Sequence, residues 1–279
     1  MSDRRLLLVH AHPDDESTVT GATMARYAAE GATVTLVTCT SGELGEVVAP
    51  ELAHLRDSPE ALGEHRRREL DGALAEFGDI RQHWLGGPGR WRDSGMAGLT
   101  SNSAEGVFAA ADPGEVTREV VRLLRAERPH VVVTYDDYGG YGHPDHIAAN
   151  RAVMNALDPA ADADWEPQLG EAWTVPKVYW ITLPTSFVER MHAAGATDFN
   201  PGAVPDAKIT AVLDGTAQHP RKLAALRHYR SQVDVDDDGF FARMVRQPEF
   251  VQEHFLLVRG ERGPGAGEHD QETDLFAGL

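Results

Sequence analysis

The stretch Leu6–Cys39, LLLVHAHPDDESTVTGATMARYAAEGATVTLVTC, decides the fold of this chain of 279 residues. Its apolar runs Leu6–Val9 and Val34–Cys39 are short, which indicates two buried strands. Between them, alanines recur at helical spacing over Thr18–Glu30, and Gly31 stands where a glycine commonly ends a helix. Strand, helix and strand in this order form a unit whose strands are parallel and joined by a right-handed crossover.

The same alternation continues along the chain. Apolar residues at helical spacing predict helices over Glu64–Phe77, between Asp112 and Pro129, and over Ile147–Leu157, while apolar or β-branched runs predict strands that close at Trp84-Leu85 and that cover His130–Tyr135 and Val178–Leu183. Alternating strands and helices are typical of the α/β class: a Rossmann-like open, mostly parallel sheet with helices on both faces. Because neither a repeat nor a linker divides the sequence, we expect a single domain over residues 1–279.

Three stretches lack a strand or helix pattern and are expected to be irregular: Leu99–Pro113, Asp158–Pro176 and Gly260–Thr273. The sequence leaves open whether the first of them closes over a substrate. Residues 260–279 begin with a Gly- and Glu-rich segment and are expected to form a flexible C-terminal tail. Leu275 and Phe276 are the exception, because their apolar side chains can dock on the body of the protein.

Charge and cysteine content restrict the partners and the compartment. The formal net charge is −18, from 26 basic and 44 acidic residues, whereas nucleic acids and anionic membranes favour clustered Lys and Arg. Cys39 is the single cysteine, which suits a reducing compartment. The apolar run before His10 is too short for a signal peptide, and no run approaches the roughly 18 apolar residues of a membrane span. We therefore expect a cytoplasmic protein that binds neither nucleic acid nor membrane; its oligomeric state is not determined.

Polar residues are dense after two of the predicted strands. The motif His10-Ala-His-Pro-Asp-Asp-Glu16 follows the first strand, and Tyr141-Gly-His-Pro-Asp-His146 follows a later β-branched strand. Sites in open α/β sheets form beyond the carboxyl ends of the strands, so we expect the two motifs to meet. His12, Asp15 and His146 then offer two imidazoles and a carboxylate with an open fourth position, as in catalytic zinc sites. The same set also serves Fe(II).

The neighbours of these ligands supply the other groups that a metal-dependent hydrolase needs. Such an enzyme requires a base for the attacking water and a group that stabilises the developing oxyanion. Asp14 remains a free carboxylate if Asp15 binds the metal, so it can act as the base. His143, as an imidazolium, can stabilise the oxyanion or protonate the leaving amine, and Asp145 can orient an imidazole. The residues alone thus indicate a hydrolytic metal site without naming a substrate.

The motifs AHPDDE at 11–16 and GHPDH at 142–146 together resemble the LmbE/PIG-L family of zinc-dependent N-acetylglucosamine deacetylases. The resemblance covers most of residues 5–150 and continues weakly in KLAALRHYRSQ at 222–232. Three stretches resemble the members that deacetylate N-acetylglucosaminyl inositol in mycothiol biosynthesis: TCTSGELGEV at 38–47, GGPGRWRDSGMAG at 86–98 and GGYGHPDH at 139–146. The sequence leaves open whether His228, in the C-terminal stretch, approaches the site.

The resemblance also implies roles for individual residues. It implies one zinc ion per chain on the three ligands named above, with Asp14 as general base, His143 as electrostatic or acid partner and Tyr141 as a mobile group near the carbonyl oxygen. It places four residues in the pocket for sugar and inositol: Glu46, Arg66, Asp93 and Met96. The implied partner is a small-molecule amino sugar–inositol substrate, and charged side chains suit its hydroxyl groups.

Three other functions are compatible with parts of the sequence. An amidase of the same family that cleaves mycothiol S-conjugates would keep the metal and catalytic residues, but it usually has proline where this chain has Gly142. Some overlap between the two activities is compatible with the motifs. A nucleotide-binding module would need a glycine-rich phosphate loop after the first strand, where this chain has carboxylates. A catalytically inactive sugar-binding protein would have no use for a free carboxylate at Asp14.

Overall fold

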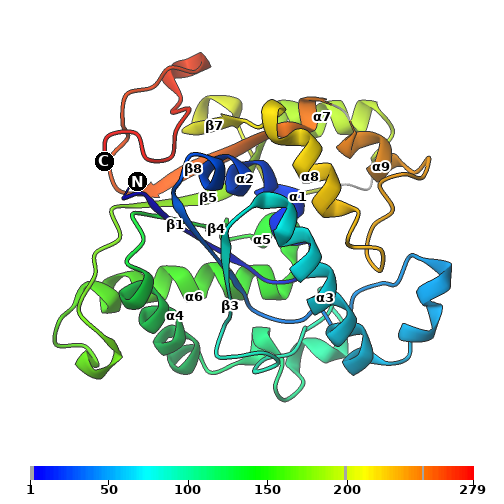
Figure 1. Ribbon diagram of the computed structural model, residues 1–279, viewed down its shortest axis with the longest axis horizontal. Coiled ribbons are helices and arrows are strands. Elements are labelled where there is room, and N and C mark those ends of the chain that lie inside the picture. The colour runs from blue at the N-terminus through cyan, green and yellow to red at the C-terminus, as the bar shows by residue number, and fades with distance from the viewer. Residues whose placement is uncertain (1–2, 198–199, 247) are drawn as a thin grey trace.

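An eight-stranded sheet forms the centre of the computed structural model, which describes residues 3–197, 200–246 and 248–279 (Figure 1). Among these residues the strand order is β3-β2-β1-β4-β5-β8-β7, and β6 pairs with β5 outside this path. The strands are β1 (Arg5–His10), β2 (Thr33–Thr38), β3 (Ile80–Trp84), β4 (Val131–Tyr135), β5 (Lys177–Pro184), β6 (Ala203–Val204), β7 (Ala211–Asp214) and β8 (Gln252–Arg259).

Most strand pairs in this sheet are parallel. From β3 to β5 every neighbouring pair is parallel, and Leu8 in β1 lies opposite Leu36 on one side and Val133 on the other. The strand β8 runs antiparallel to both β5 and β7. These last two strands escape prediction from the sequence because β7 has four residues and β8, QEHFLLVR, mixes charged and apolar side chains. The expected class, an open and mostly parallel α/β sheet, is confirmed.

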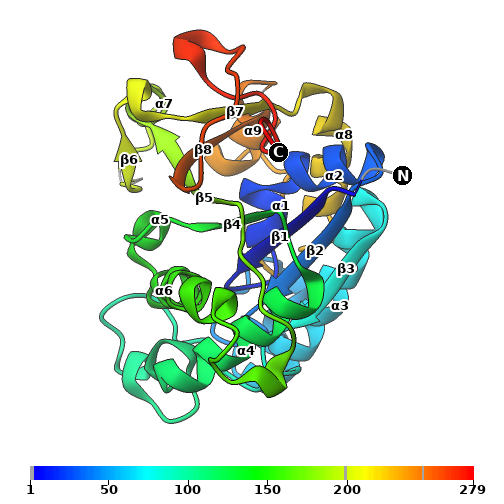
Figure 2. The ribbon, with the colours of Figure 1, turned by 90° about the vertical axis from the view of Figure 1, so that its left-hand side faces the viewer.

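Helices cover both faces of the sheet, as expected (Figure 2). They are α1 (Asp15–Val19), α2 (Gly21–Ala29), α3 (Pro59–Phe77), α4 (Pro113–Glu127), α5 (Gly139–Gly142), α6 (Pro144–Ala161), α7 (Thr185–Ala193), α8 (His219–Leu226) and α9 (Phe240–Val245). Residues of α4 and α6 share one core with Leu7 and Val9, and residues of α2, α3 and α8 share another with Leu6 and Leu8. Alternate side chains of β1 enter different cores because successive strand residues point to opposite faces. Within the described ranges, no helix is long and apolar enough to cross a membrane.

The helix expected over Thr18–Glu30 is interrupted at Thr20. This residue has a φ of −136°, and its hydroxyl donates to the carbonyl oxygen of Glu16 (3.0 Å) and lies 2.9 Å from His10 Nε2. A second helix, α2, starts after it, and the free N–H groups of Ala22 and of the next residue donate to the carboxylate of Glu253 on β8. The break arises because these buried polar groups find partners outside a continuous helix.

Two further boundaries differ from the expectation. The helix expected over Ile147–Leu157 is α6, which begins at Pro144 and continues to Ala161. The stretch Leu99–Pro113 contains two short 3-10 turns, Thr100–Ser103 and Phe108–Ala110, and its Phe108 side chain is buried in the core under α4 and α6. Phe108 therefore anchors the second of these turns to the body of the protein.

The chain after Gly260 returns to the sheet. Buried Lys177 on β5 donates from Nζ to Glu272 Oε1 (2.5 Å), and Tyr179 Oη donates to Glu272 Oε2 (2.7 Å). Leu275 and Phe276 are buried in the same core as α2 and α3. Leu275 and Phe276 thus dock on the body of the protein, as their apolar side chains allow.

Candidate metal centre

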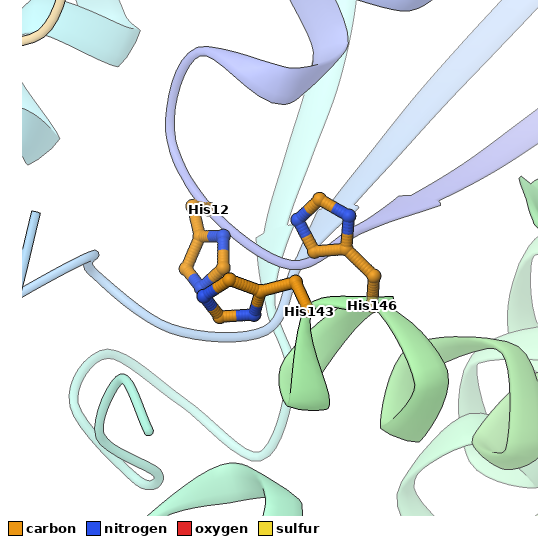
Figure 3. Close-up of side chains that lie close together, drawn as sticks. All are labelled: His12, His143 and His146. Atoms are coloured by element: carbon orange, nitrogen blue, oxygen red, sulfur yellow. The ribbon is translucent and has the colours of Figure 1, made fainter. Parts of the chain in front are cut away.

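The two His-Pro-Asp motifs meet at the carboxyl edge of the sheet. The loop after β1 carries His12, and the first turn of α6 carries His146, with His143 at its N-cap. Because β1 and β4 are parallel neighbours, their ends lie side by side. Figure 3 shows the three imidazoles gathered between the loop and the helix. Their ring centroids lie 4.6 to 5.3 Å apart. The convergence expected from the strand pattern is present.

Two of the distances among the predicted ligand atoms suit a shared metal ion. Asp15 Oδ2 lies 3.3 Å from His12 Nδ1 and 3.4 Å from His146 Nε2. Ligand atoms at the usual zinc distances sit about 3.3 to 3.5 Å apart across the edge of a tetrahedron. Nε2 of His146 is buried and, among the described residues, has no hydrogen-bond partner. Buried nitrogen atoms are normally hydrogen-bonded, so an unsatisfied one beside a carboxylate is consistent with a role as a metal ligand.

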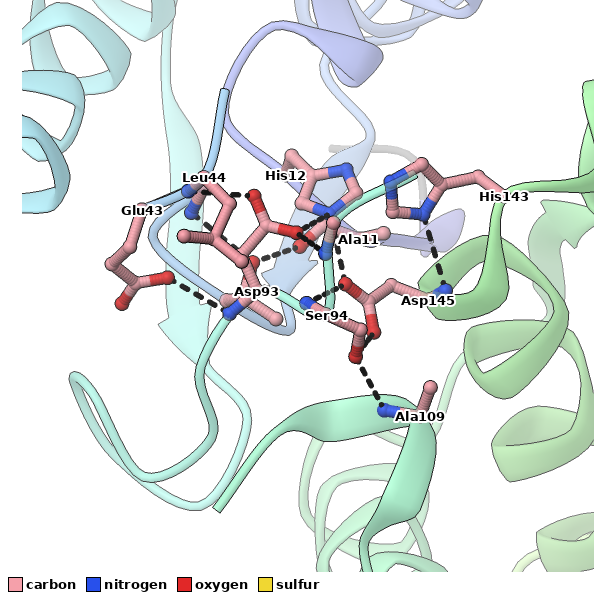
Figure 4. Close-up of polar contacts among 12 residues, drawn as sticks. Ala11, His12, Glu43, Leu44, Asp93, Ser94, Ala109, His143 and Asp145 are labelled. Atoms are coloured by element: carbon pink, nitrogen blue, oxygen red, sulfur yellow. Dashed lines mark hydrogen bonds and ion pairs between the residues drawn. The ribbon is translucent and has the colours of Figure 1, made fainter. Parts of the chain in front are cut away.

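The other nitrogen of His12 is held by carboxylates. His12 Nε2 lies 3.2 Å from Asp145 Oδ2 and 3.5 Å from Asp93 Oδ1 (Figure 4). Asp145 is fixed in turn by Ser94, whose N–H donates to Oδ2 (2.8 Å) and whose hydroxyl donates to Oδ1 (2.5 Å). Metal-binding histidines usually donate their second N–H to such a carboxylate, which sets the tautomer. This arrangement leaves His12 Nδ1 free to face Asp15 and a metal.

The charges around His12 favour a cation. Burial lowers the pKa of His12, but Asp93, Asp145 and Asp15 outweigh that effect, so its pKa lies well above the usual value. Negative charge in a buried site stabilises any positive charge placed there, whether a proton or a metal ion. The residues present therefore fit a divalent cation.

A second group of donors lies on the other side of His12. Among the described residues, two sets of donor atoms lie within 4.8 Å of one another: His12, His143 and His146, and His12, Asp93, His143 and Asp145. In the second set the carboxylates already accept hydrogen bonds: Asp145 from Ser94, and Asp93 from the N–H groups of Leu44 (3.1 Å) and Gly95 (2.8 Å). Asp15 likewise accepts hydrogen bonds, from the N–H of His12 (2.9 Å) and from Tyr135 (2.8 Å). The feature that distinguishes the Asp15 side is the unsatisfied Nε2 of His146, 3.4 Å from Asp15 Oδ2.

Tyr135, at the end of β4, contacts two of the predicted ligands. Its hydroxyl donates to Asp15 Oδ2 (2.8 Å) and accepts the N–H of Ala11 (2.9 Å). Its ring stacks on that of His146, with centroids 4.1 Å apart and an interplanar angle of 17°. No motif in the sequence pointed to this residue; the only available signal was its place at the carboxyl end of a strand beside the site.

Asp14, the predicted base, has an unusual backbone. Its φ of 111° lies in the left-handed region that residues other than glycine rarely adopt. Its side chain lines the cavity, with Oδ1 3.2 Å from Nη2 of Arg66. Burial raises the pKa of Asp14 to about 7; Arg66 opposes this shift and Asp15 adds to it. A base whose pKa lies near neutral pH can both accept and return a proton there.

His143 is held as a neutral ring. Its Nδ1 accepts the N–H of Asp145 (3.2 Å) and so caps α6. Burial, together with the nearby rings of His12 and His146, lowers the pKa of His143 to about 4. A neutral ring that accepts at Nδ1 carries its proton on Nε2. The imidazolium form expected from the sequence is therefore disfavoured, and the ring instead offers an N–H donor.

A cavity of about 700 Å³ contains the metal residues and the four predicted substrate residues, Glu46, Arg66, Asp93 and Met96. Met96 is 53% exposed at the mouth, whereas Arg66 and Asp93 are buried. The guanidinium of Arg66 donates to the carbonyl oxygens of Pro13 and Gly42. Arg66 thus fixes the loop that carries the base, a role the sequence did not reveal. Tyr141 also lines the cavity, and its ring lies 5.0 Å from that of His146.

His228 lies away from this centre. Its Nε2 is 3.2 Å from Oε1 of Glu76 on the surface, and 40% of its side chain is exposed. The neighbouring Tyr229 is instead the buried member of the C-terminal stretch, with its hydroxyl 2.6 Å from Glu16 Oε1. The question that the sequence left open is answered: the histidine does not line the cavity, whereas the tyrosine contacts Glu16, the neighbour of Asp15.

Comparison with known proteins identifies the family of this chain. The sequence model of the family described as PIG-L, GlcNAc-PI de-N-acetylase, matches residues 7–157. The chain belongs to the PIG-L family. It is 70% identical over 273 residues to the 1D-myo-inositol 2-acetamido-2-deoxy-alpha-D-glucopyranoside deacetylase 2 of Saccharopolyspora erythraea, covering 98% of this chain and 100% of that protein. It is 49% identical over 294 residues to the enzyme of that name without the number, from Streptomyces avermitilis, covering 100% of this chain and 98% of the relative.

Solved structures extend the likeness to the PIG-L fold. The N,N'-diacetylchitobiose deacetylase of Pyrococcus horikoshii superposes with a TM-score of 0.67 at 20% identity, covering 92% of this chain and 84% of that one. At this identity the comparison supports the architecture and not a substrate. The resemblance predicted from the two His-Pro-Asp motifs is confirmed.

Proposed function

We propose that the protein is a zinc-dependent amidohydrolase that removes the acetyl group from N-acetylglucosaminyl inositol, 1D-myo-inositol 2-acetamido-2-deoxy-α-D-glucopyranoside, in mycothiol biosynthesis. The observation that carries the proposal is the placement of Asp15 Oδ2 at 3.3 Å from His12 Nδ1 and 3.4 Å from His146 Nε2, with Asp14 beside them. The relatives with high identity are named for this deacetylation. Fe(II) would suit the same ligands.

His12, Asp15 and His146 would hold the metal, which when bound polarises the amide carbonyl and acidifies water. Asp14 accepts the proton of the attacking water, because its pKa of about 7 lets it act as a base at neutral pH. The same carboxyl group can then return that proton to the leaving nitrogen. Water and amide thereby become acetate and a free amine, with the proton passing through Asp14.

His143 and Tyr141 face the carbonyl oxygen from the other side. The Nε2–H of neutral His143 donates to the oxygen as negative charge develops on it, and the hydrogen bond at Nδ1 fixes the ring for that purpose. Tyr141 is 46% exposed and follows Gly140, whose φ is 72°. A side chain at the open end of a glycine-rich turn can swing toward the carbonyl when substrate binds.

The polar lining suits a substrate that is rich in hydroxyl groups. The carboxylate of Asp93 and the guanidinium of Arg66 are held by backbone groups, so both are oriented before substrate arrives. Glu46 and Met96 stand at the more open part of the cavity, where the second ring would lie. The amino sugar–inositol is thus the partner we propose. We also propose that the chain forms a single domain and acts in the cytoplasm, because a chain with one cysteine suits a reducing compartment.

An amidase acting on mycothiol S-conjugates is the second candidate, and one observation disfavours it. Gly142 has a φ of 86°, and proline is restricted to about −65°. The loop before His143 therefore has a backbone that the proline usual in the amidase cannot adopt. The deacetylase reading needs no such change.

An amine-release experiment tests the proposal. The protein is incubated with N-acetylglucosaminyl inositol or with a mycothiol S-conjugate, and free amine and bound metal are measured together. We expect the acetylated sugar to be the better substrate by kcat/KM. We also expect Asp14→Ala to keep the metal and to lose about a hundred- to ten-thousand-fold in kcat, the usual contribution of a general base. Full turnover by Asp14→Ala would remove Asp14 from the mechanism, and preference for the conjugate would make the amidase the main activity.

A further inference from the structure

Glu16, the last residue of the AHPDDE motif, has no place in the metal site described above. Its side chain is fully buried, and it lies on α1 one position after Asp15. Its carboxylate accepts three hydrogen bonds: from the backbone N–H of Asp14 to Oε2 (3.0 Å), and from the hydroxyls of Ser17 (2.5 Å) and Tyr229 (2.6 Å) to Oε1. A buried carboxylate is costly unless it is hydrogen-bonded, so these donors fix it firmly.

The bond to the N–H of Asp14 lies where the backbone is strained. Asp14 has a φ of 111° and a ψ of −30°, and a residue with a Cβ resists such a conformation. Strain of this kind persists only where surrounding contacts hold the chain in place. On the carbonyl side, Asp14 accepts bonds from the N–H and the hydroxyl of Thr18, both 2.9 Å. On the N–H side, Glu16 is the partner.

Tyr229 reaches this carboxylate from the C-terminal stretch KLAALRHYRSQ. It is fully buried in the turn after α8. That turn is anchored two residues later, where Ser231 donates from its N–H (2.8 Å) and its hydroxyl (2.6 Å) to the carboxylate of Glu69 on α3. The tyrosine hydroxyl is thus presented from a fixed backbone, and the hydrogen bonds connect it through Glu16 to the backbone of Asp14.

We propose that Glu16 and Tyr229 are positioning residues for the base: together they hold the strained backbone of Asp14 so that its carboxylate faces the substrate. The inference rests on the proposed role of Asp14. It explains why a buried glutamate ends the N-terminal motif and why a tyrosine stands in the C-terminal stretch. Neither side chain touches the reacting atoms; both act through Asp14.

Tyr229→Phe is the first test, because it removes only the hydroxyl. A misplaced catalytic group commonly costs up to about a hundred-fold in rate, so we expect kcat to fall about ten- to a hundred-fold. KM and bound metal should stay within about two-fold, since the variant leaves the ligands and the binding residues in place. Tyr179→Phe is the matched control, because its hydroxyl also donates to a buried glutamate, Glu272, at 2.7 Å but outside the cavity. The control should lose comparable stability and keep its kcat.

Combining Tyr229→Phe with Asp14→Ala shows whether the hydroxyl acts through the base. In the Asp14→Ala background, loss of the hydroxyl should not lower kcat further, since residues that act as a unit are not additive. The proposal would be overturned if Tyr229→Phe lowered kcat by the same factor in the Asp14→Ala background as in the unmodified protein. A Tyr229→Phe variant with normal kcat would also overturn it. Full activity of Asp14→Ala alone would instead refute the assignment of the base.

If Tyr229→Phe does not fold, two substitutions of Glu16 provide the test. Glu16→Gln keeps an acceptor for the N–H of Asp14 and should retain more activity than Glu16→Ala. Equal activities of these two variants would refute the role of Glu16.

Discussion

Replacing Tyr135 by phenylalanine should weaken metal binding without emptying the site. The hydroxyl donates to Asp15 Oδ2 at 2.8 Å, while the ring stacks on His146 with centroids 4.1 Å apart. Phenylalanine keeps the stacking and removes the hydroxyl, and with it both the bond to the carboxylate and the bond from the N–H of Ala11. The variant therefore removes the hydroxyl contact with a proposed ligand while the ring contact with His146 remains.

The magnitude follows from the chemistry of that bond. A hydrogen bond to a charged group contributes about 1.5 to 3 kcal/mol. We expect the bond in both the metal-free and the metal-bound protein, so most of its free energy cancels between the two states. Only the contribution that comes from orienting Asp15 changes the affinity for the metal. At about 1.4 kcal/mol for each ten-fold change, we expect the dissociation constant to rise about ten-fold, at the low end of the range for groups that orient metal ligands.

Competition with a chromophoric chelator measures this constant directly, without turnover. Tyr27→Phe is the control: its hydroxyl donates to Asp274 (2.9 Å) and accepts the N–H of Leu275 (2.7 Å), away from the cavity. It thus repeats the pattern of Tyr135, which donates to an aspartate and accepts a backbone N–H. Equal metal affinity of the two variants would refute the reasoning, because the loss would then come from general destabilisation.

Three more outcomes follow from the structure. His146→Ala should lower the bound metal measured by elemental analysis, whereas Asp93→Asn should keep it; the reverse result would move the metal to the other donor set around His12. A chelator should abolish amine release, and added zinc should restore it; activity that survives complete metal removal would exclude a metal-dependent reaction. Glu272→Gln leaves Lys177 as a buried charge without its partner, so the free energy of unfolding should fall by about 3 to 5 kcal/mol in urea denaturation. A change below 1 kcal/mol would show that the end of the chain contributes little to stability.

Much of the fold could be read from local patterns. The run at Leu6–Val9, the helical alanines and Gly31 encode a strand, a helix and its end over a few residues each, and short-range periodicity survives in any tertiary context. Strands β7 and β8 could not be predicted in this way, because pairing makes them strands and not an alternating pattern: β8 pairs with β5, and β7 pairs with β8. Thr20 shows the same limit: a partner on another strand, Glu253, helps to end one helix and begin the next.

The candidate site divides along the same line. The sequence by itself determined that two polar motifs follow neighbouring strands, and it predicted His12, Asp15 and His146 as the metal donors from the spacing within those motifs. Only the tertiary structure decided the contacts of these motifs: Tyr135 reaches Asp15 across 120 positions, and Tyr229 reaches Glu16 across 213. It also favours a neutral His143, because burial and the neighbouring imidazoles lower the pKa of this ring to about 4, while the cap on α6 sets its tautomer. Ligand identity is carried by residue type, whereas orientation and protonation depend on which distant segments the packed chain brings into contact.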